Sequence, residues 1–444
     1  MPFRAACASE NDDARDREGP GVSALYLYDD QRARTFEPFA TTRPVSEMVA
    51  GALTIRDRWR RVAPLAEARF LAGPRHGLFD EAGAKPAGGV IPAGSIVASS
   101  RCIPAIPRDP DAAARRLAAC SMWRVGNRLA AVRLKDAMDA SAFDDGLRPL
   151  EELHPGTGAV GAIDGWWVDE VWDFIRLLPE QLAQDIAALA SLAARTVPLP
   201  PHVTVLGNHS VTVIGRTEDL PPESADTIIE PHVVLDASAG PIYIGAGTHV
   251  RAFTRITGPC YIGREVSVMG GDITGCSIGD VSKVRGELSN TVVLGYSNKG
   301  HDGFVGHSYL GRWVNLGAGT VTSNLKNTYG TVALWTPDGV RDTGLQFLGT
   351  MFGDHVKTGI GLRLSTGTVL GAGANVYDRM PPKVVAPFSW GDGPPYSVYH
   401  ADKFVETAAR MMSRRHVELT ERARRHLASV HAGRWTAGME THAT

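Results

Sequence analysis

A histidine between two glycines, His301, opens the stretch of this sequence whose residue types could do chemistry. The stretch covers residues 298–324 and reads NKGHDGFVGHSYLGRWVNLGAGTVTSN. An imidazole titrates near neutral pH and can take a proton from an attacking amine. Backbone N–H groups of a glycine turn, or the amides of Asn315 and Asn324, could stabilise the oxyanion that forms next. These residue types fit acyl transfer from a thioester to an amine, with His301 as the base.

Further residues around this histidine fit the same chemistry. Glu287 could orient His301, because it lies one stretch of the repeat pattern earlier and parallel coils stack. The GAGT segment contains Ala318 and Gly319, two small residues that would let a long ligand lie against the backbone.

A metal site is the alternative use of these polar residues. His301, Asp302 and His307 could be imagined as ligands of a zinc ion, as in hexapeptide-repeat enzymes with three histidines. No second histidine falls at a matching position of the repeat, so the sequence predicts no certain metal site.

The elements that must position these residues show a hydrophobic period of six. It runs through Ile244, Val250, Ile256, Ile262 and Val268, then Ile278 and Val284, then Phe304, Leu310 and Leu316, and finally Phe352, Thr358, Leu364, Leu370 and Val376. A strand would repeat every two residues and a helix every three or four. The period of six predicts a parallel β-helix whose triangular coils each take three hexapeptides. Residues 286–303 and 324–342 are expected to loop out of the coils.

The N-terminal half has the pattern of an α/β domain. The run SALYLYDD predicts a buried first strand ending in Asp29 and Asp30, at the edge where such sheets bind ligands. A helix predicted to begin at Pro44 would place its N-terminus beside Arg43, which could hold a phosphate. A structural salt bridge is the alternative for Arg43. No glycine-rich loop follows the first strand, which weakens a nucleotidyl-transfer prediction.

Other segments complete the expected order of elements and domains. We expect strands within 94–104 and 128–134, a helix over 109–120, a long helix or helix pair within 166–194 broken at Pro179, and a helix over 396–426. Buried Trp172 and Phe174 should serve packing. The predicted domains are a disordered tail (1–22), an α/β domain (23–196), a linker leading into the repeats (197–228), the β-helix (229–391) and a C-terminal helical segment (392–444).

Composition narrows the classes of partner. The 46 basic and 48 acidic residues nearly balance, so no nucleic-acid partner is expected. Five scattered cysteines form no CxxC pair and predict reduced thiols. No apolar run is long enough to span a bilayer, and the first twenty residues lack the apolar core of a secretory signal. We therefore expect a cytoplasmic protein without a membrane partner.

Residues 229–391 resemble the acetyltransferase half of the bifunctional UDP-N-acetylglucosamine diphosphorylase/glucosamine-1-phosphate N-acetyltransferase family. The family pattern GHxxYxGxxxxGxxxNxGAGTxxxN aligns without gaps from Gly300 to Asn324. Residues 23–415 resemble still more closely a divergent branch of that family, regarded as sugar nucleotidyltransferases. The shared motifs are TTRPVSEM, YSNKGHDGF, NLGAGTVTSNLKN, DTGLQF, GDHVKTGI and PFSWG.

The resemblance implies roles for individual residues. His301 falls on the general base, Asn315 and Asn324 on acceptor-binding asparagines, Ala318 on the alanine whose backbone contacts the acetyl thioester, and Glu287 on a glutamate of the site. It also implies a left-handed β-helix that forms homotrimers, acetyl-CoA and an amino sugar phosphate as substrates, and UTP or dTTP with Mg²⁺ if the first domain is active.

Two departures from the family pattern bear on the acceptor. Phe304 replaces a tyrosine, and Ser289 stands where a phosphate-binding lysine is expected. Lys299 or Lys326 could replace that lysine. Two alternatives stay open: a sugar-1-phosphate nucleotidyltransferase whose β-helix only oligomerises or regulates, and a non-catalytic scaffold.

Overall fold

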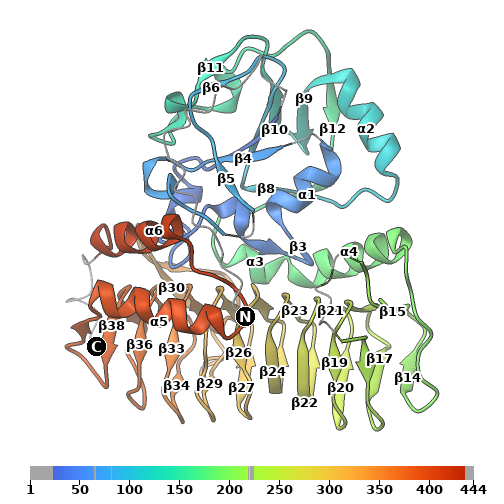
Figure 1. The fold of residues 1–444 in the computed structure, drawn as a ribbon, viewed down its shortest axis with the longest axis vertical. Coiled ribbons are helices and arrows are strands. Elements are labelled where there is room, and N and C mark those ends of the chain that lie inside the picture. The colour runs from blue at the N-terminus through green and yellow to red at the C-terminus, as the bar shows by residue number, and fades with distance from the viewer. Residues whose placement is uncertain (1–23, 65–66, 82, 219, 221–224, 436–444) are drawn as a thin grey trace, which may run out of the picture.

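The computed structural model describes residues 24–64, 67–81, 83–218, 220 and 225–435. The predicted disordered tail, 1–22, lies outside the described residues. An α/β domain lies over one long side of a parallel β-helix, and two C-terminal helices lie against the end where the β-helix finishes (Figure 1). The predicted fold class is confirmed.

A seven-stranded sheet forms the centre of the α/β domain. Its order is β12 (Ala159–Ala162), β9 (Cys120–Val125), β10 (Arg128–Arg133), β7 (Ile96–Ser99), β1 (Leu25–Tyr28), β4 (Ala68–Leu71) and β5 (Lys85–Pro86). All neighbours pair in parallel except those of β10. Every residue of β1 is buried, as expected for a central strand covered on both faces.

The helices of this domain follow local signals in the sequence. Asp109 caps α2 (Pro110–Ala119) by accepting from the backbone N–H of Ala112, and Thr54 caps α1 (Ile55–Val62) in the same way. The predicted helix pair is α3 (Asp173–Arg176) and α4 (Leu178–Leu192), with Pro179 in the first turn of α4. Short elements complete the domain: β2 (Val49–Ala50), β3 (Leu53–Thr54), β6 (Val90–Ile91), β8 (Cys102–Pro104), β11 (Met138–Asp139), β13 (Gly165–Trp167) and the 3₁₀ turns Ala33–Thr35, Val45–Glu47, Pro74–His76, Ala140–Phe143 and Leu150–Glu152.

The helix predicted to begin at Pro44 is wrong. Only a single 3₁₀ turn, Val45–Glu47, follows the proline, and the chain then forms the β2–β3 hairpin before α1 begins at Ile55. The apolar stripe from Val45 to Ile55 is buried around this hairpin instead of along one helix.

Three parallel ladders form the sides of the β-helix. The domain face, which carries the α/β domain, consists of β15 (Val211–Val213), β18 (Ile242–Ile244), β21 (Cys260–Ile262), β23 (Ser277–Ile278), β25 (Val292–Val293), β28 (Tyr309–Leu310), β32 (Thr350–Phe352), β35 (Thr368–Leu370) and β37 (Val384–Val385). The asparagine face consists of β16 (Ile228–Ile229), β19 (His249–Val250), the first parts of β22 (Ser267–Thr274) and β24 (Lys283–Ser289), β26 (Asn298–Lys299), β33 (Lys357–Thr358), β36 (Asn375–Val376) and β38 (Ser389–Gly391), with β39 (Ser397–Val398) antiparallel at its end. The glutamate face consists of β14 (Thr204–Gly207), β17 (Val234–Ala237), β20 (Thr254–Thr257), the second parts of β22 and β24, β27 (Phe304–Gly306), β29 (Val321–Thr322) and β34 (Arg363–Leu364).

The six-residue period corresponds to residues that point into this helix, with one exception. Val268, Val284 and Leu316 are nearly fully buried in one column of the asparagine face. Phe304, however, is only half-buried, and the neighbouring Val305 is the buried residue of that coil. The inward assignment of Phe304 is wrong by one residue.

Of the two predicted excursions, one is present. Residues 286–303 stay within the coils, because β24, β25 and β26 pair in register with their neighbours. Residues 324–342 do leave the coils. They contain the whole antiparallel hairpin of β30 (Ala333–Thr336) and β31 (Gly339–Asp342).

Two boundaries differ from those expected. The ladders begin at β14 and β15, inside the segment predicted as a linker, before residue 229. The C-terminal helix is two helices, α5 (Ala401–Ser413) and α6 (Glu421–Ala432), and His416 between them has a positive φ of 57°.

The α/β domain and the β-helix share one hydrophobic core. The Tyr309 hydroxyl of the domain face donates to the Val49 carbonyl (3.0 Å) and accepts from the Val49 N–H (2.8 Å). Ser277 donates to the Gly51 carbonyl at 2.6 Å. These contacts attach the β2–β3 hairpin to the β-helix, so the two parts hold a fixed relation.

Candidate active site on the β-helix

His301 lies at the corner between the asparagine face and the glutamate face. We call residues 300–303 the His301 corner. The imidazole is exposed, and it has no hydrogen-bond partner among the described residues. The corner itself is fixed: the Gly303 carbonyl accepts from Glu287 N–H (3.2 Å), and Asp302 pairs through its carboxylate with Arg285 (3.0 Å). An accessible ring on a fixed backbone is the geometry a general base requires.

The predicted partners of His301 flank this corner on two different faces. Glu287 and Phe304 are register partners on the glutamate face, one coil apart. Asn315 lies on the asparagine face and accepts from the Asn298 amide at 3.2 Å. No hydrogen bond joins Glu287 to His301 in the described structure, so the orienting contact predicted for Glu287 is absent here.

Ala318 and Gly319 form the equivalent corner of the next coil. The Gly319 N–H donates to the Asp302 carbonyl at 3.0 Å, which stacks this corner directly on that of His301. Ala318 is exposed, and its carbonyl accepts from Gly361 at 2.7 Å. Within the described ranges its N–H donates to no backbone or side-chain acceptor, which leaves a free donor in the corner stacked on that of His301.

Asn324 is held by His307, which was considered above only as a conceivable zinc ligand. Its amide donates to Nδ1 of His307 at 2.9 Å, and the His307 ring stacks on Phe347 with 5.2 Å between centroids. Burial lowers the pKa of His307 to about 4. A neutral His307 can accept from Asn324, so the ring orients this predicted acceptor ligand.

Lys299 is not available to a substrate phosphate, which corrects one prediction. It is 3% exposed and occupies the inward column between Val284 and Leu316. Its ammonium donates to the carbonyls of Arg285 (2.7 Å) and His301 (2.9 Å). Burial lowers its pKa to about 8.

Other cations lie near the corner in its place. Lys326 is half-buried at the base of the β30–β31 excursion. On the asparagine face, Arg415 donates to the Asn298 amide oxygen at 2.5 Å. Burial, and then the charges of Arg415, Arg414 and Arg251, lower the pKa of Lys283. Lys283 is the register partner of Asn298, and Lys357 that of Asn315. Sequence spacing could not bring Arg415 to Asn298, because 117 residues separate the two.

A second candidate site lies at the carboxyl edge of β1 and β7. A cavity of about 340 Å³ there, the arginine pocket, is lined by Asp30, Arg32, Arg101, Arg128, Arg148 and Trp167 among others. The Asp30 carboxylate accepts from Arg101 at 2.6 to 2.9 Å. The Arg128 guanidinium lies over the Trp167 ring, 3.8 Å from its centroid. Asp30 lies at this edge of the sheet, as predicted. The arginines were not predicted, because they come from distant strands and loops.

Asp29 and Asp30 do not act together. Asp29 is 2% exposed, accepts from the Val45 N–H at 2.9 Å and lines a different cavity from Asp30. Burial raises its pKa to about 6. No three His, Cys, Asp or Glu side chains within the described ranges gather closely enough to hold a metal ion. These residues therefore do not fit a Mg²⁺ ion bound by the protein alone.

Arg43 has the structural role that was the alternative to phosphate binding. It is 2% exposed and donates to Asp354 and to Glu81, both at 2.8 Å. Asp354 belongs to the β-helix, so this buried ion pair joins the two parts of the molecule. A guanidinium with both carboxylates in place has no free face for a nucleotide.

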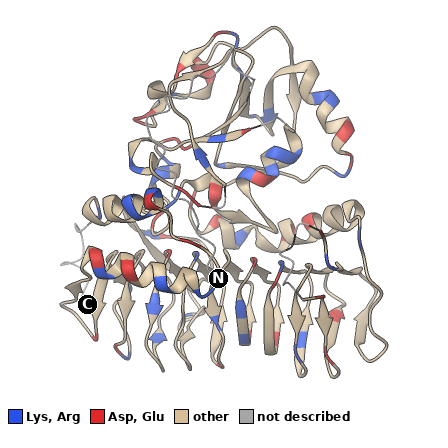
Figure 2. Cartoon of the chain, viewed as in Figure 1, with Lys and Arg blue, Asp and Glu red and all other residues tan. Residues whose placement is uncertain are grey.

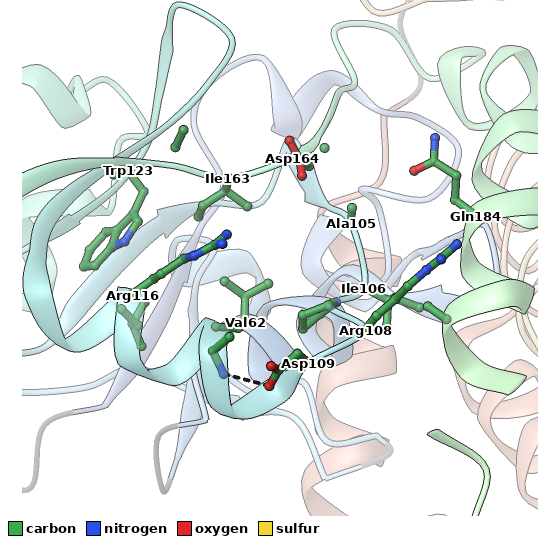
Figure 3. A pocket seen from close by; sticks show the side chains of 18 of the residues that line it. Val62, Ala105, Ile106, Arg108, Asp109, Arg116, Trp123, Ile163, Asp164 and Gln184 are labelled. Carbon is green, nitrogen blue, oxygen red and sulfur yellow. Dashed lines mark hydrogen bonds between the residues drawn. The ribbon is translucent and has the colours of Figure 1, made fainter. Parts of the chain in front are cut away.

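A larger cavity, of about 810 Å³, contains none of the predicted site residues. It is a groove between α2 and α4 with apolar residues such as Val62, Ile106 and Trp123 on its floor (Figure 3). Arg108, Asp164 and Gln184 stand at its rim. Both signs of charge occur there, and the groove indicates no particular ligand.

The chain combines an α/β domain with a parallel β-helix, and each part carries one candidate site. Residues 25–193 match the family model described as sugar nucleotidyl transferase. A bifunctional sugar-1-phosphate nucleotidylyltransferase/acetyltransferase of Sulfurisphaera tokodaii is 33% identical over 91 residues, 20% of this chain and 23% of its own. The bifunctional protein GlmU of Rippkaea orientalis is 31% identical over 142 residues (28% and 30%), and that of Acaryochloris marina 27% identical over 243 residues (50% and 48%).

The chain is thus a divergent, GlmU-like relative of these bifunctional proteins, with a sugar nucleotidyl transferase match in its N-terminal part. The matched segments span less than half the length of each of these three relatives. None of the helices in the described part of the chain is long and apolar enough to cross a membrane.

Proposed function

We propose that the β-helix transfers an acyl group from acetyl-CoA to the amino group of a sugar phosphate. The observation that carries this proposal is the stacking of the exposed His301 corner on the Ala318 corner, with its free N–H. A base and an oxyanion donor, side by side at one edge of the helix, are the two groups that acyl transfer from a thioester requires.

The chemistry follows from these groups. His301 takes the proton from the acceptor amine as its nitrogen attacks the thioester carbonyl carbon. The carbonyl oxygen becomes an oxyanion, which the N–H of Ala318 is placed to stabilise. Collapse of this intermediate breaks the carbon–sulfur bond, and the departing CoA thiolate takes the proton from the imidazolium. The amide and the free thiol are the products.

Binding of the two substrates is part of the same proposal. Asn315 and Asn324 contact the acceptor sugar, and Lys326 is the predicted cation that remains accessible for its phosphate. The basic group of Lys283, Arg414 and Arg415 offers charge to the phosphates of CoA. Phe304 has no hydroxyl for the acceptor, so the acceptor differs from that of the GlmU relatives at the group that a tyrosine would contact.

The test is thiol release from acetyl-CoA in the presence of glucosamine-1-phosphate and other amino sugar phosphates. In the variant His301→Asn we expect kcat to fall by about 10²- to 10⁴-fold, the usual contribution of a general base. His209→Asn is the matched control, because His209 is also exposed but lies in the first coil. Undiminished thiol release in His301→Asn would exclude this mechanism.

A second activity, sugar-1-phosphate nucleotidyl transfer with UTP or dTTP, is favoured by the arginine pocket. Four arginines at the carboxyl edge of a parallel sheet provide cations where such folds bind phosphates. The test is pyrophosphate release from UTP or dTTP with Mg²⁺ and a sugar-1-phosphate. We expect Arg128→Gln to raise the KM for the nucleotide by about tenfold, as loss of about 1.4 kcal/mol of binding would. Arg115→Gln on the exposed side of α2 should change nothing.

Assembly and location complete the proposal. A homotrimer with the His301 corner facing a neighbouring subunit would enclose a site that one chain leaves open. A reducing, cytoplasmic location is supported by the free state of Cys102, Cys120, Cys260 and Cys276. Pyrophosphate release without any thiol release would leave the β-helix the role of oligomerisation, and loss of both activities would indicate a scaffold.

A further inference from the structure

Lys299 is the one charged side chain in a column of the β-helix interior that is otherwise apolar or hydroxylic over the coils of Val250, Val268, Val284, Leu316, Thr358 and Val376. A valine or leucine would fill this position, as it does in the coils on either side. Burying an ammonium group away from water is costly. The lysine at this one coil, which carries His301, therefore requires an explanation beyond packing.

We propose that Lys299 is a positioning residue for His301, which it holds through the backbone of the corner; the proposal rests on the acyltransferase function. Its ammonium donates to the carbonyl of His301 itself at 2.9 Å and to that of Arg285, in the corner of the coil before, at 2.7 Å. One side chain thus ties two successive corners together from the inside of the helix.

The remaining contacts of the corner show what this tie adds. Outside the helix, Asp302 is held by Arg285 and by the Gly319 N–H, and Gly303 by the Glu287 N–H. The carbonyl of His301 itself is fixed from the interior, by Lys299 alone among the described residues. Since the imidazole has no partner of its own, its direction depends on this peptide group. Loss of the lysine should leave the coil intact and the ring free to turn.

The decisive variant is Lys299→Met, which keeps the length and apolar stem of the side chain and removes its donors. Because a buried charge is removed, the thermal midpoint should stay equal to that of the wild type or rise. We expect kcat for acyl transfer to fall at least tenfold, while the KM values for acetyl-CoA and the acceptor change less than threefold. Val268→Met, the same side chain in the same column two coils earlier, is the control and should keep kcat.

Hydrogen exchange of the free protein gives a readout that needs no substrate. The amides to follow are the N–H groups of Glu287 and Gly319, which donate to the Gly303 and Asp302 carbonyls of the corner. Both should exchange at least tenfold faster in Lys299→Met, and peptides from the domain face should not change. An unchanged kcat, or a fall in kcat together with faster exchange throughout the β-helix, would overturn the positioning role. If the wild-type chain releases no thiol, the acyltransferase proposal fails on its own, and an unchanged exchange rate at Glu287 and Gly319 would then also refute the tie.

Discussion

Two nitrogen bases two residues apart, Lys299 and His301, lie on opposite sides of the same strand end. Alternation along a β-strand would put residues two apart on the same face, so the strand pattern alone would bury both. β26 ends at Lys299, and the turn that begins at Gly300 exposes the imidazole. Sequence motifs suggested both as site residues and could not show that one is buried and the other exposed. The register of the coil decides which of these two side chains is exposed to water. A shift of the register by one residue would exchange the buried and the exposed positions.

The pH dependence of stability follows from the buried, neutral His307. Its pKa in the folded chain is about 4, and an unfolded histidine titrates near its ordinary value of 6.5. Between these values the unfolded chain binds a proton that the folded chain does not, so stability falls as the pH falls from about 6.5 to about 4. In urea unfolding at stepped pH, His307→Gln should reduce this slope by about one proton per chain. The exposed His209→Gln should leave the slope unchanged, and an equal slope in both variants would contradict the assignment.

Gly303 is the glycine of the His301 corner that no residue with a side chain can replace without strain. Its φ is 136°, and a Cβ there would lie 2.3 Å from the Thr320 carbonyl oxygen. We expect Gly303→Ala to lower the free energy of unfolding by about 1–3 kcal/mol, the cost of forcing such a backbone on an alanine, before any clash is counted. At Gly300 a Cβ would meet nothing within 4 Å, so Gly300→Ala should change stability by less than about 1 kcal/mol. Equal effects of the two substitutions would show that the corner relaxes.

At the scale of elements, the β30–β31 hairpin joins the two candidate sites. It leaves the coils just after Asn324 and reaches the α/β domain, where Asp338 pairs with Arg32 at 2.9 Å and Arg341 pairs with Glu170 at 2.5 Å. Arg32 also lines the arginine pocket. One excursion therefore contacts the edge of the arginine pocket and begins at Asn324, a residue of the proposed acyl-transfer site.

The attachment of this hairpin should depend on apolar burial and little on its ion pairs. Leu334 is fully buried in the shared core, whereas the Asp338 side chain is 55% exposed. Leu334→Ala should cost about 2–5 kcal/mol, and Asp338→Asn less than about 1 kcal/mol. Urea unfolding monitored by tryptophan fluorescence measures both. A larger effect of Asp338→Asn would mean that the Arg32 pair carries the contact.

Sequence patterns predicted the elements with strong periodicity and missed those whose form depends on tertiary contacts. The six-residue period located the β-helix because every inward column demands an apolar residue. The coil at 286–303 lacked that signal, because Lys299 takes the inward place and Gly286 bends the strand. The buried pairing of Arg43 with Asp354 was undecidable from spacing, since 311 residues separate the two. The arginine pocket was missed for the same reason.

At the scale of the whole molecule, the two parts are not independently folded units. The core around β1 and Trp59 continues through Val332, Leu334 and Leu348 of the excursion to Tyr309 and Met351 of the domain face. Charged residues of both signs occur along both parts of the chain (Figure 2). Apolar burial therefore holds the parts together.

Separate expression should expose this shared core. We expect fragments 1–196 and 197–444, each made alone, to aggregate or to bind an apolar dye strongly, while the full chain does neither. Size-exclusion chromatography with light scattering measures this, and for the full chain it also tests the proposed trimer. Two monodisperse, dye-free fragments would show that each part can close its own core.

The excursion from the β-helix also bears on how this sequence can change. Leu334 and Leu348 of the excursion lie in one hydrophobic core with Trp59 of the α/β domain and Tyr309 of the domain face. A substitution on one side of this core alters the surroundings of side chains on the other side. The two parts should therefore tolerate a change in volume there only when the facing side chains change with it.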